Sequence, residues 1–311
     1  MLIIEMLLMS LEESMLQNYR LKICVNFNDK TYTDTITDKF LLDKINSFCT
    51  LCHNKQVLYG YFQKSNYNDH YSIVLVCSPD INVVYLKDLY YQQLATIVTK
   101  VTIVTKDDYQ MVDNNLQVFG YQLKNQETVT YISEKTRLNY SYYDFIWYSL
   151  PTSFIQVNKY AGTYIHNLVQ ELICKDIKHF CGIGGEMGIY AKAFSINDAT
   201  CLTNSQDIYD DCILNLDSCK FHLVDYDTVN LSQYMSNLDQ VLVINISRNG
   251  LRGLARQIVE LDFKQIIYIG CSDKAVRHDL DILKKRYVID KMYINGEYQS
   301  YVISLIPQKI D

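Results

Sequence analysis

The chain has 311 residues, which is enough for two domains of ordinary size, and its 49% hydrophobic content supplies apolar side chains for two cores. Its formal net charge of -6 excludes a protein that binds nucleic acid over its whole surface, because Lys and Arg contacts to phosphate supply most non-specific affinity. We therefore expect a soluble globular protein in which any contact with nucleic acid is local.

The first half of the chain predicts a short leading segment and an α+β domain. Residues 1–18 are expected to form an amphipathic helix rather than a signal peptide or a membrane span, because their apolar start lacks a basic flank and contains acidic residues. Residues 19–150 are expected to form the α+β domain, with an antiparallel sheet, because short runs rich in Tyr, Val and Ile alternate with polar turns. The runs are 21–27, 57–62, 71–77 and 128–132.

The second half, residues 151–311, alternates strand-like runs with helical periodicity, which implies right-handed βαβ units and a mostly parallel sheet. Strands are expected at 177–180, 199–202, 220–224, 240–246 and 265–270, and helices at 158–175, 185–194, 205–216, 252–260 and 273–285. Runs at 287–294 and 298–306 suggest a closing antiparallel pair. The predicted fold class is α/β, with a Rossmann-like, doubly wound domain after the α+β domain.

The cysteines bear on compartment and on metal binding. Ten cysteines without the density of a small secreted scaffold indicate a reducing intracellular compartment, such as the cytoplasm, an organelle matrix or a viral factory. Cys49 and Cys52 form a close pair, but no second pair or histidines follow at zinc-ligand spacing. Cys24 and Cys77 are too scattered to complete an iron–sulfur set, so we expect no metal.

One cysteine has the position of a nucleophile. The apolar run 266–270 leads directly into Cys271, and a helical pattern follows. Ligands bind at the carboxyl ends of strands in open α/β sheets, so a thiol at this point faces the expected site. The alternative is that Cys271 is a small buried apolar residue, as most of the ten cysteines must be.

The surrounding motifs resemble those of a known family. Residues 271–280 resemble the Cys-Asn-Pro-x-Thr-Leu-x-Arg-Asp-Leu segment of the S-adenosylmethionine-dependent RNA uracil-5-methyltransferases that act on tRNA or ribosomal RNA. In the same order, residues 153–158 match the family's Phe-x-Gln-x-Asn element, residues 180–185 its glycine-rich cofactor loop, and residues 241–251 a strand that ends in Asp-Pro-Pro-Arg-x-Gly-Leu. Residues 19–22, Tyr-Arg-Leu-Lys, resemble the opening of the family's central domain.

The resemblance implies a class I methyltransferase domain and specific roles. Cys271 would add to C6 of uracil, making C5 nucleophilic toward the cofactor's methyl group, and a base would then remove the C5 proton. Arg248 and Asn245 lie in the strand-end motif of the catalytic site. The residues that the resemblance places at the cofactor S-adenosylmethionine are Gln156, Asn158, Cys181, Gly182, Gly184 and Thr203, and Asp225 at the end of the third strand is a further candidate. The implied partner is RNA, tRNA or ribosomal RNA.

Four positions that are acidic in the family differ here. They are Lys178 before the glycine-rich loop, Thr203 at the ribose-binding position, Asn245 at the base-contacting position and Gln299 at the general-base position. Glutamine does not accept a proton at neutral pH, so a strict transfer of roles removes the deprotonation step. Glu297 is the alternative base, because residues two apart on a strand share a face. Asp207 and Asp225 are the alternative cofactor acids, and Lys178 is expected to disfavour a cationic sulfonium.

These departures leave three interpretations open. The first is a divergent uracil-5-methyltransferase homologue with weakened or lost methyl transfer, retained to bind RNA or a protein partner that supplies RNA affinity. The second is an active enzyme with Cys271 as nucleophile and Glu297 as base. The third is a structural subunit of an RNA–protein or viral particle, which the 27 tyrosines would suit because tyrosine favours interfaces.

Overall fold

The structure is a computed structural model that describes part of the chain. The described residues are 22–26, 31–32, 57–65, 67, 71–77, 84, 88, 100–105, 128–131, 137–150, 153–156, 159–174, 177–196, 198–235, 240–295 and 300–308. Contacts between Cα atoms divide the chain into two compact units, one that ends at Tyr160 and one that begins at Ala161. The domain boundary expected between residues 150 and 151 stays a prediction.

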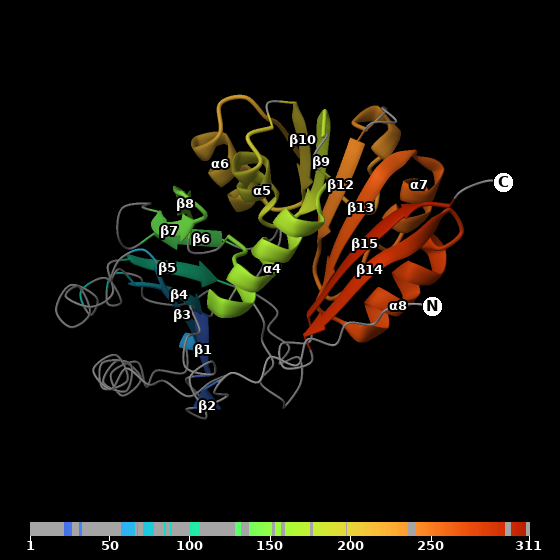
Figure 1. Ribbon diagram of the computed structural model, residues 1–311. Helices are drawn as coiled ribbons and strands as arrows, with labels where there is room; N and C mark the ends of the chain where they lie inside the picture. The colour runs from blue at the N-terminus through green and yellow to red at the C-terminus, as the bar shows by residue number, and fades with distance from the viewer. Residues whose placement is uncertain are drawn as a thin grey trace. The chain divides into compact units, whose positions relative to one another are not determined.

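The first unit contains a mixed sheet and a hairpin (Figure 1). The sheet has the order β2-β1-β3-β4-β5-β6, and all described pairs are antiparallel except β4 with β5. The parallel pair differs from the purely antiparallel expectation, and it needs the long connection between residues 77 and 100. The strands are β1 (Lys22–Asn26), β2 (Thr31–Tyr32), β3 (Val57–Lys64), β4 (Tyr71–Cys77), β5 (Lys100–Thr105) and β6 (Thr128–Tyr131), and the hairpin joins β7 (Leu138–Tyr142) to β8 (Phe145–Ser149).

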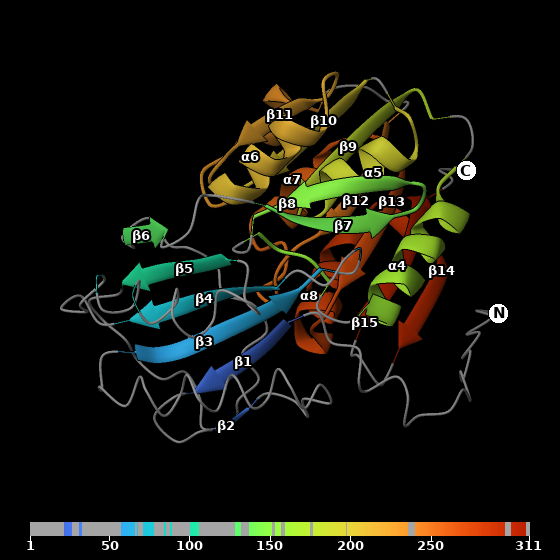
Figure 2. The ribbon, with the colours of Figure 1, turned by 90° about the vertical axis from the view of Figure 1, so that its left-hand side faces the viewer.

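The second unit is built on one sheet with the order β11-β10-β9-β12-β13-β15-β14 (Figures 1 and 2). Strands β11, β10, β9, β12 and β13 run parallel, and β15 and β14 close the sheet as the expected antiparallel pair. The strands are β9 (His179–Gly184), β10 (Ala199–Thr203), β11 (Lys220–Leu223), β12 (Gln240–Asn245), β13 (Phe263–Gly270), β14 (Tyr287–Asn295) and β15 (Ser300–Pro307). The Rossmann-like α/β fold is thus confirmed.

Helices cover both faces of this sheet, and Figure 1 shows α5 and α6 on the opposite side from α7 and α8. Every residue of β12 is buried, as expected for a central parallel strand that is covered on both faces. Helix α8 buries Val276, Asp279, Leu280 and Leu283, the spacing of one helical face turned to the sheet. The helices are α4 (Lys159–Leu172), α5 (Met187–Ala193), α6 (Gln206–Asn215), α7 (Leu254–Glu260) and α8 (Asp273–Leu283), with a short 3-10 helix η2 (Leu231–Gln233).

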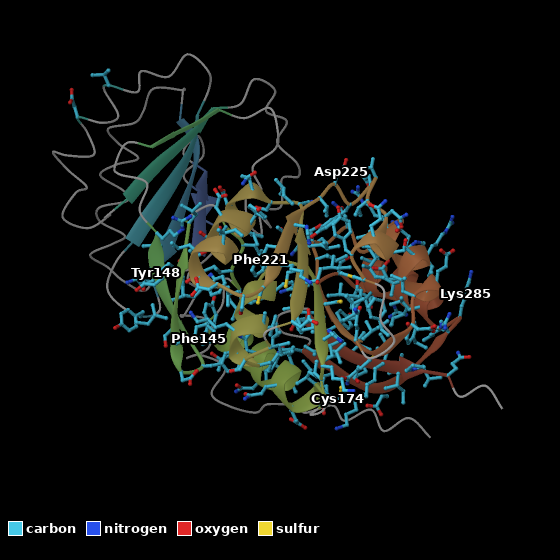
Figure 3. All side chains as sticks on the ribbon, turned by 90° about the horizontal axis from the view of Figure 1, so that it is seen from above. Phe145, Tyr148, Cys174, Phe221, Asp225 and Lys285 are labelled. Carbon is cyan, nitrogen blue, oxygen red and sulfur yellow. The ribbon has the colours of Figure 1, made fainter. Side chains whose placement is uncertain are left out.

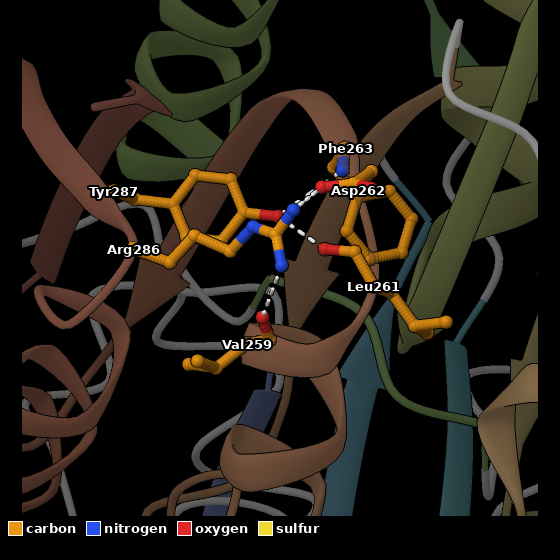
Figure 4. A network of polar contacts seen from close by, with 6 residues as sticks. All are labelled: Val259, Leu261, Asp262, Phe263, Arg286 and Tyr287. Carbon is orange, nitrogen blue, oxygen red and sulfur yellow. Dashed lines mark hydrogen bonds and ion pairs between the residues drawn. The ribbon is translucent and has the colours of Figure 1, made fainter. Parts of the chain in front are cut away.

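A polar network fixes the turn after α7 to the start of β14 (Figure 4). The hydroxyl of Tyr287 donates to the carbonyl of Leu261 at 2.6 Å and accepts from the amide of Phe263 at 3.1 Å. Arg286 forms an ion pair with Asp262 beside it. These contacts join the first residue of β13 to the first residue of β14. They therefore fix the antiparallel strands β14 and β15 relative to the parallel strands of the sheet.

Strand β9 is longer than the sequence pattern predicts. The strand was expected to end at residue 180, but it continues through Gly184, so most of the glycine-rich motif lies within the sheet. The turn that follows is Gly185 and Glu186. Lys178 precedes the strand and therefore lies at the amino edge of the sheet, roughly 20 Å from the carboxyl edge at about 3.3 Å per residue. No helix in the described part of the chain is long and apolar enough to cross a membrane.

Candidate functional site

The carboxyl ends of the parallel strands form one edge of the sheet in the second unit. From β9 at the centre of the sheet, the next strands in the chain, β10 and β11, are added on one side. The strands β12 and β13 are added on the other side of β9. The chain order therefore reverses between β9 and β12, which is the topological switch point where open α/β sheets bind ligands. Residues that directly follow β9, β12 and β13 lie at this point.

The backbones of β9 and β12 approach very closely there. Gly184 pairs with Asn245, and the next amide, that of Gly185, donates to the carbonyl of Asn245 at 2.8 Å. Gly184 has a φ of 110°, and a Cβ atom at this position would lie 1.9 Å from the Asn245 oxygen. Only glycine fits, because a side chain would clash with the backbone and would strain its own φ.

Cys271 follows β13 at this edge, beside Arg248 from the turn after β12. The thiol is partly buried, and burial raises its pKa above the ordinary value. The positive charge of Arg248 and a hydrogen bond from its side chain act in the opposite direction and lower the pKa. Arg248 thus stabilises the thiolate, the nucleophilic form of cysteine, in a site that otherwise favours the thiol.

A buried carboxylate holds the turn that carries Arg248. Asp279 on α8 accepts hydrogen bonds from the amide of Leu251 at 2.8 Å and from the hydroxyl of Tyr268 at 2.7 Å. Gly250 in the same turn has a φ of 70°, and a Cβ atom there would lie 2.7 Å from Asp279. The sequence motif contains Asp279, but its function in anchoring the turn beside Cys271 becomes visible only in the structure.

A second buried carboxylate, that of Glu186, was missed in the sequence. Glu186 follows the glycine-rich strand with a φ of 63°, and its side chain is 0% exposed. Asn245 Nδ2 donates to Glu186 Oε2 at 3.2 Å, and His166 Nε2 from α4 lies 3.5 Å from the same oxygen. The His166 ring packs against the Tyr190 ring with centroids 5.0 Å apart. Glu186 directly follows the glycines of the cofactor-loop motif, and this position in the sequence could have indicated a residue of the site.

The hydroxyl of Tyr226 fills the space between the ends of β9 and β10. It donates to the carbonyl of Leu202 at 3.2 Å. The amides of Gly184 and Asn204 and the hydroxyl of Thr203 also face it and lower its pKa, although burial raises the pKa overall. The Tyr226 hydroxyl is therefore engaged by polar groups at the ends of both β9 and β10.

Three residues assigned to the cofactor have local partners in the structure. Asp225 is exposed after β11 and accepts from the amide of Asp227 at 2.9 Å within its own turn (Figure 3). Cys181 is buried inside β9, donates to Gln240 at 3.0 Å and has its pKa raised by burial to about 12. A Cβ atom at Gly182 would lie 2.8 Å from Met187, so this glycine allows α5 to pack on β9. Their roles in cofactor binding stay predictions.

The structure also places Thr203, which stands where the family has an acid, and Asp207, one of the two expected substitutes for that acid. Thr203 is buried at the end of β10, where its hydroxyl accepts from the amide of Ser205 at 3.2 Å. Asp207 is buried in the first turn of α6. The interpretation of Lys178 as a positive charge in the cofactor pocket is wrong, because Lys178 precedes β9 at the opposite edge of the sheet.

Four other predicted residues are not placed relative to this edge of the sheet. Gln156 is partly buried and belongs to the unit that ends at Tyr160. Asn158, Glu297 and Gln299 lie outside the described residues. Among the residues that the structure describes, no group of three or more His, Cys, Asp and Glu side chains could hold a metal ion.

Comparison with known proteins identifies related sequences. The chain is 23% identical over 188 residues to the 23S rRNA (uracil(747)-C(5))-methyltransferase RlmC of Shewanella sp. strain ANA-3, covering 55% of this chain and 47% of the relative. The RlmC of Shewanella sp. strain W3-18-1 is 21% identical over 188 residues, covering 55% of this chain and 46% of the relative. The chain thus spans about half the length of the curated relatives it matches. It matches no known family profile.

A solved structure shares the fold. The tRNA (uracil-54, C5)-methyltransferase of Pyrococcus abyssi, solved in complex with S-adenosyl-L-homocysteine, superposes with a TM-score of 0.63 and 13% identity. The match covers 93% of this chain and 76% of that chain. The resemblance to the S-adenosylmethionine-dependent RNA methyltransferases, predicted from the motifs, is confirmed, and the Rossmann-like α/β fold is shared with this solved structure.

The contact between Arg248 and Cys271 gives a direct test. Replacing the guanidinium in Arg248→Gln removes the charge that lowers the thiol pKa, so the reactivity of Cys271 should move to higher pH. Arg248 is exposed and partly screened by solvent, so we expect alkylation at neutral pH to slow by about threefold to tenfold. The measurement is the iodoacetamide rate of the Cys271 peptide by mass spectrometry across pH.

Arg256→Gln, an exposed arginine on α7, is the matched control and should leave the profile unchanged. An unaltered profile in Arg248→Gln would show that Arg248 does not activate the thiol.

Proposed function

From its relationship to the RNA methyltransferases, we propose that the chain is an S-adenosylmethionine-dependent RNA (uracil-5-)-methyltransferase with Cys271 as nucleophile. The observation that carries the proposal is the position of Cys271 at the carboxyl end of β13, with Arg248 lowering the pKa of the thiol. Burial raises the pKa of this thiol, and the Arg248 guanidinium opposes that rise, so it favours the thiolate form that nucleophilic catalysis needs.

The covalent chemistry of the proposal has the following steps. The Cys271 thiolate forms a bond to C6 of the uracil ring, and the electron pair of the C5–C6 double bond becomes available at C5. S-adenosylmethionine, when bound, would supply the methyl group: the C5 electron pair would form a bond to the methyl carbon as its bond to sulfur breaks, and S-adenosylhomocysteine would be the leaving group. A base then accepts the C5 proton, the C5–C6 double bond forms again, and the sulfur leaves C6 as thiolate. Glu297 is the proposed base.

The edge of the sheet fits the cofactor in part. Gly184 ends β9 at this edge, and Gly185 follows it. Glu186 provides a buried carboxylate next to this backbone, a charge suited to a cationic sulfonium. Thr203 is the last residue of β10 and Asp225 follows β11 at the same edge, where they would hold the ribose and the adenine. RNA, either tRNA or ribosomal RNA, is the proposed substrate.

A second candidate function is the one first inferred from the sequence, an RNA-binding homologue with weakened or lost methyl transfer. The Tyr226 hydroxyl favours it, because this group already occupies the amides of Gly184 and Asn204. The absence of a carboxylate at Thr203 favours it as well. A protein partner that supplies RNA affinity to an acidic chain belongs to this second proposal.

The activity test is direct. The purified chain, incubated with S-adenosylmethionine and an unmodified pool of tRNA and ribosomal RNA, should produce 5-methyluridine, measured by mass spectrometry of the nucleosides. Cys271→Ala should lower the yield to background, because it removes the thiol that the proposal assigns to the addition at C6. Cys219→Ala, which removes another partly buried thiol, should leave the yield unchanged. Absence of 5-methyluridine with the unmodified chain would contradict the enzyme proposal.

The second candidate predicts a change in cofactor affinity. Tyr226→Phe keeps the aromatic ring but removes the hydroxyl that competes for the amides of the glycine-rich strand. We expect S-adenosylhomocysteine to bind about fivefold more tightly to Tyr226→Phe, the value of one ordinary hydrogen bond, as measured by calorimetry. Tyr234→Phe, on the neighbouring 3-10 turn, is the control and should bind as the unmodified chain does. Equal or weaker binding by Tyr226→Phe would show that the hydroxyl does not compete with the ligand.

A further inference from the structure

The contact between Glu186 and Asn245 determines more than local packing. Asn245 is buried at the end of β12, and its side-chain nitrogen donates to Glu186 Oε2 at 3.2 Å. The Glu186 side chain is 0% exposed, so no water competes for this bond. The contact lies where β9 and β12 approach most closely, next to the hydrogen bond of 2.8 Å from Gly185 to the Asn245 carbonyl.

An ionised carboxylate accepts hydrogen bonds and does not donate them. A primary amide is planar, with its oxygen and nitrogen on opposite sides of the same carbon, and at ordinary precision the two are distinguished by their partners. Because Glu186 requires a donor, the amide of Asn245 must present its nitrogen inward. Its oxygen, which accepts no hydrogen bond from the described side chains, is therefore directed away from Glu186.

Asn245 and Cys271 lie near each other at the edge. Asn245 pairs with Ile269 on β13, and Cys271 follows two residues later. With strands about 4.8 Å apart and about 3.3 Å per residue, the two Cα atoms are separated by about 8 Å. A pyrimidine ring held with C6 at the thiol has N3 on the opposite side of the ring, within reach of a side chain at this distance.

We propose that Glu186 is a positioning residue that fixes the Asn245 oxygen toward the target base and thereby selects uracil over cytosine. This inference rests on the proposed function. Uracil carries a hydrogen on N3 and donates it to an acceptor, whereas N3 of cytosine is itself an acceptor. An oxygen held toward N3 therefore binds uracil and repels cytosine, and without Glu186 the amide can rotate and accept either base.

The experiment compares binding of three short RNAs by fluorescence anisotropy. Each RNA carries one uracil, one cytosine or one 3-methyluracil among adenines, and 3-methyluracil lacks the N3 hydrogen. The unmodified chain should prefer uracil to both other bases by about tenfold, the value of one hydrogen bond together with one repulsive contact. Glu186→Gln should lower this preference to about twofold or less, because a carboxamide both donates and accepts.

Exchanging the two side chains distinguishes an effect on the orientation of residue 245 from a loss of folding or binding. Asn245→Asp alone places a second carboxylate against Glu186, and it should lower both stability and binding. Glu186→Gln combined with Asn245→Asp restores a donor facing an acceptor, with the remaining oxygen of residue 245 directed at the base, so it should recover the preference for uracil. Recovery in the double variant is a coupling that a structural role for either residue alone does not produce.

Glu260→Gln, an exposed glutamate on α7, is the control and should behave as the unmodified chain. Thermal unfolding of each variant identifies any that fails to fold, and the comparison of uracil with 3-methyluracil on the unmodified chain tests the inference without a variant. Equal binding of all three RNAs by the unmodified chain would overturn this inference alone. Binding of none of them would contradict the proposed function and, with it, the inference.

Discussion

The close approach of β9 and β12 is the constraint on which the site depends. Gly184 leaves space for the Asn245 carbonyl, which a Cβ atom would meet at 1.9 Å. This approach brings Asn245 next to the turn that carries Glu186, and it sets the position of β13 through the pairing of Asn245 with Ile269. Cys271 follows from that pairing, because it stands two residues beyond Ile269. The glycine is therefore a requirement of the sheet itself, and its effect reaches the nucleophile through backbone register.

The acidic side chains at the site stand at other positions than the acidic residues of the family motifs. Carboxylates are absent at Thr203 and Asn245, yet Glu186 and Asp279 are buried beside the same edge. Asp279 anchors the turn after β12, and this turn carries Arg248 to Cys271. Buried carboxylates persist only with donors around them, and here the donors are the backbone of Leu251, the Tyr268 hydroxyl and the Asn245 amide. The turn after β12, which carries Arg248, is thus held by Asp279 of the segment that begins at Cys271.

Sequence reasoning predicted the second unit well because its signals are local. Continuous apolar runs identified β12 and β13, and helical periodicity identified α8, within one or two residues of the observed ends. The position of Cys271 at a strand end followed from the same pattern. What could not be predicted depends on contacts between distant residues. Glu186 meets Asn245 and His166 only after the sheet forms, and the hydroxyl of Tyr226 reaches Gly184 across two strands. Lys178 was assigned to the cofactor pocket from its place in the family's loop motif, whereas β9 continues through Gly184 and leaves Lys178 before its first residue.

The central claim is that Cys271 forms a covalent bond to the target base, and a trapping experiment tests it most directly. RNA that contains 5-fluorouridine carries no C5 proton for a base to remove, so a methylated adduct on a cysteine thiol cannot release. After incubation with this RNA and S-adenosylmethionine, intact-protein and peptide mass spectrometry should find methylated RNA attached to Cys271. Protein that remains unmodified under these conditions, with the cofactor bound as measured by calorimetry, would contradict the account.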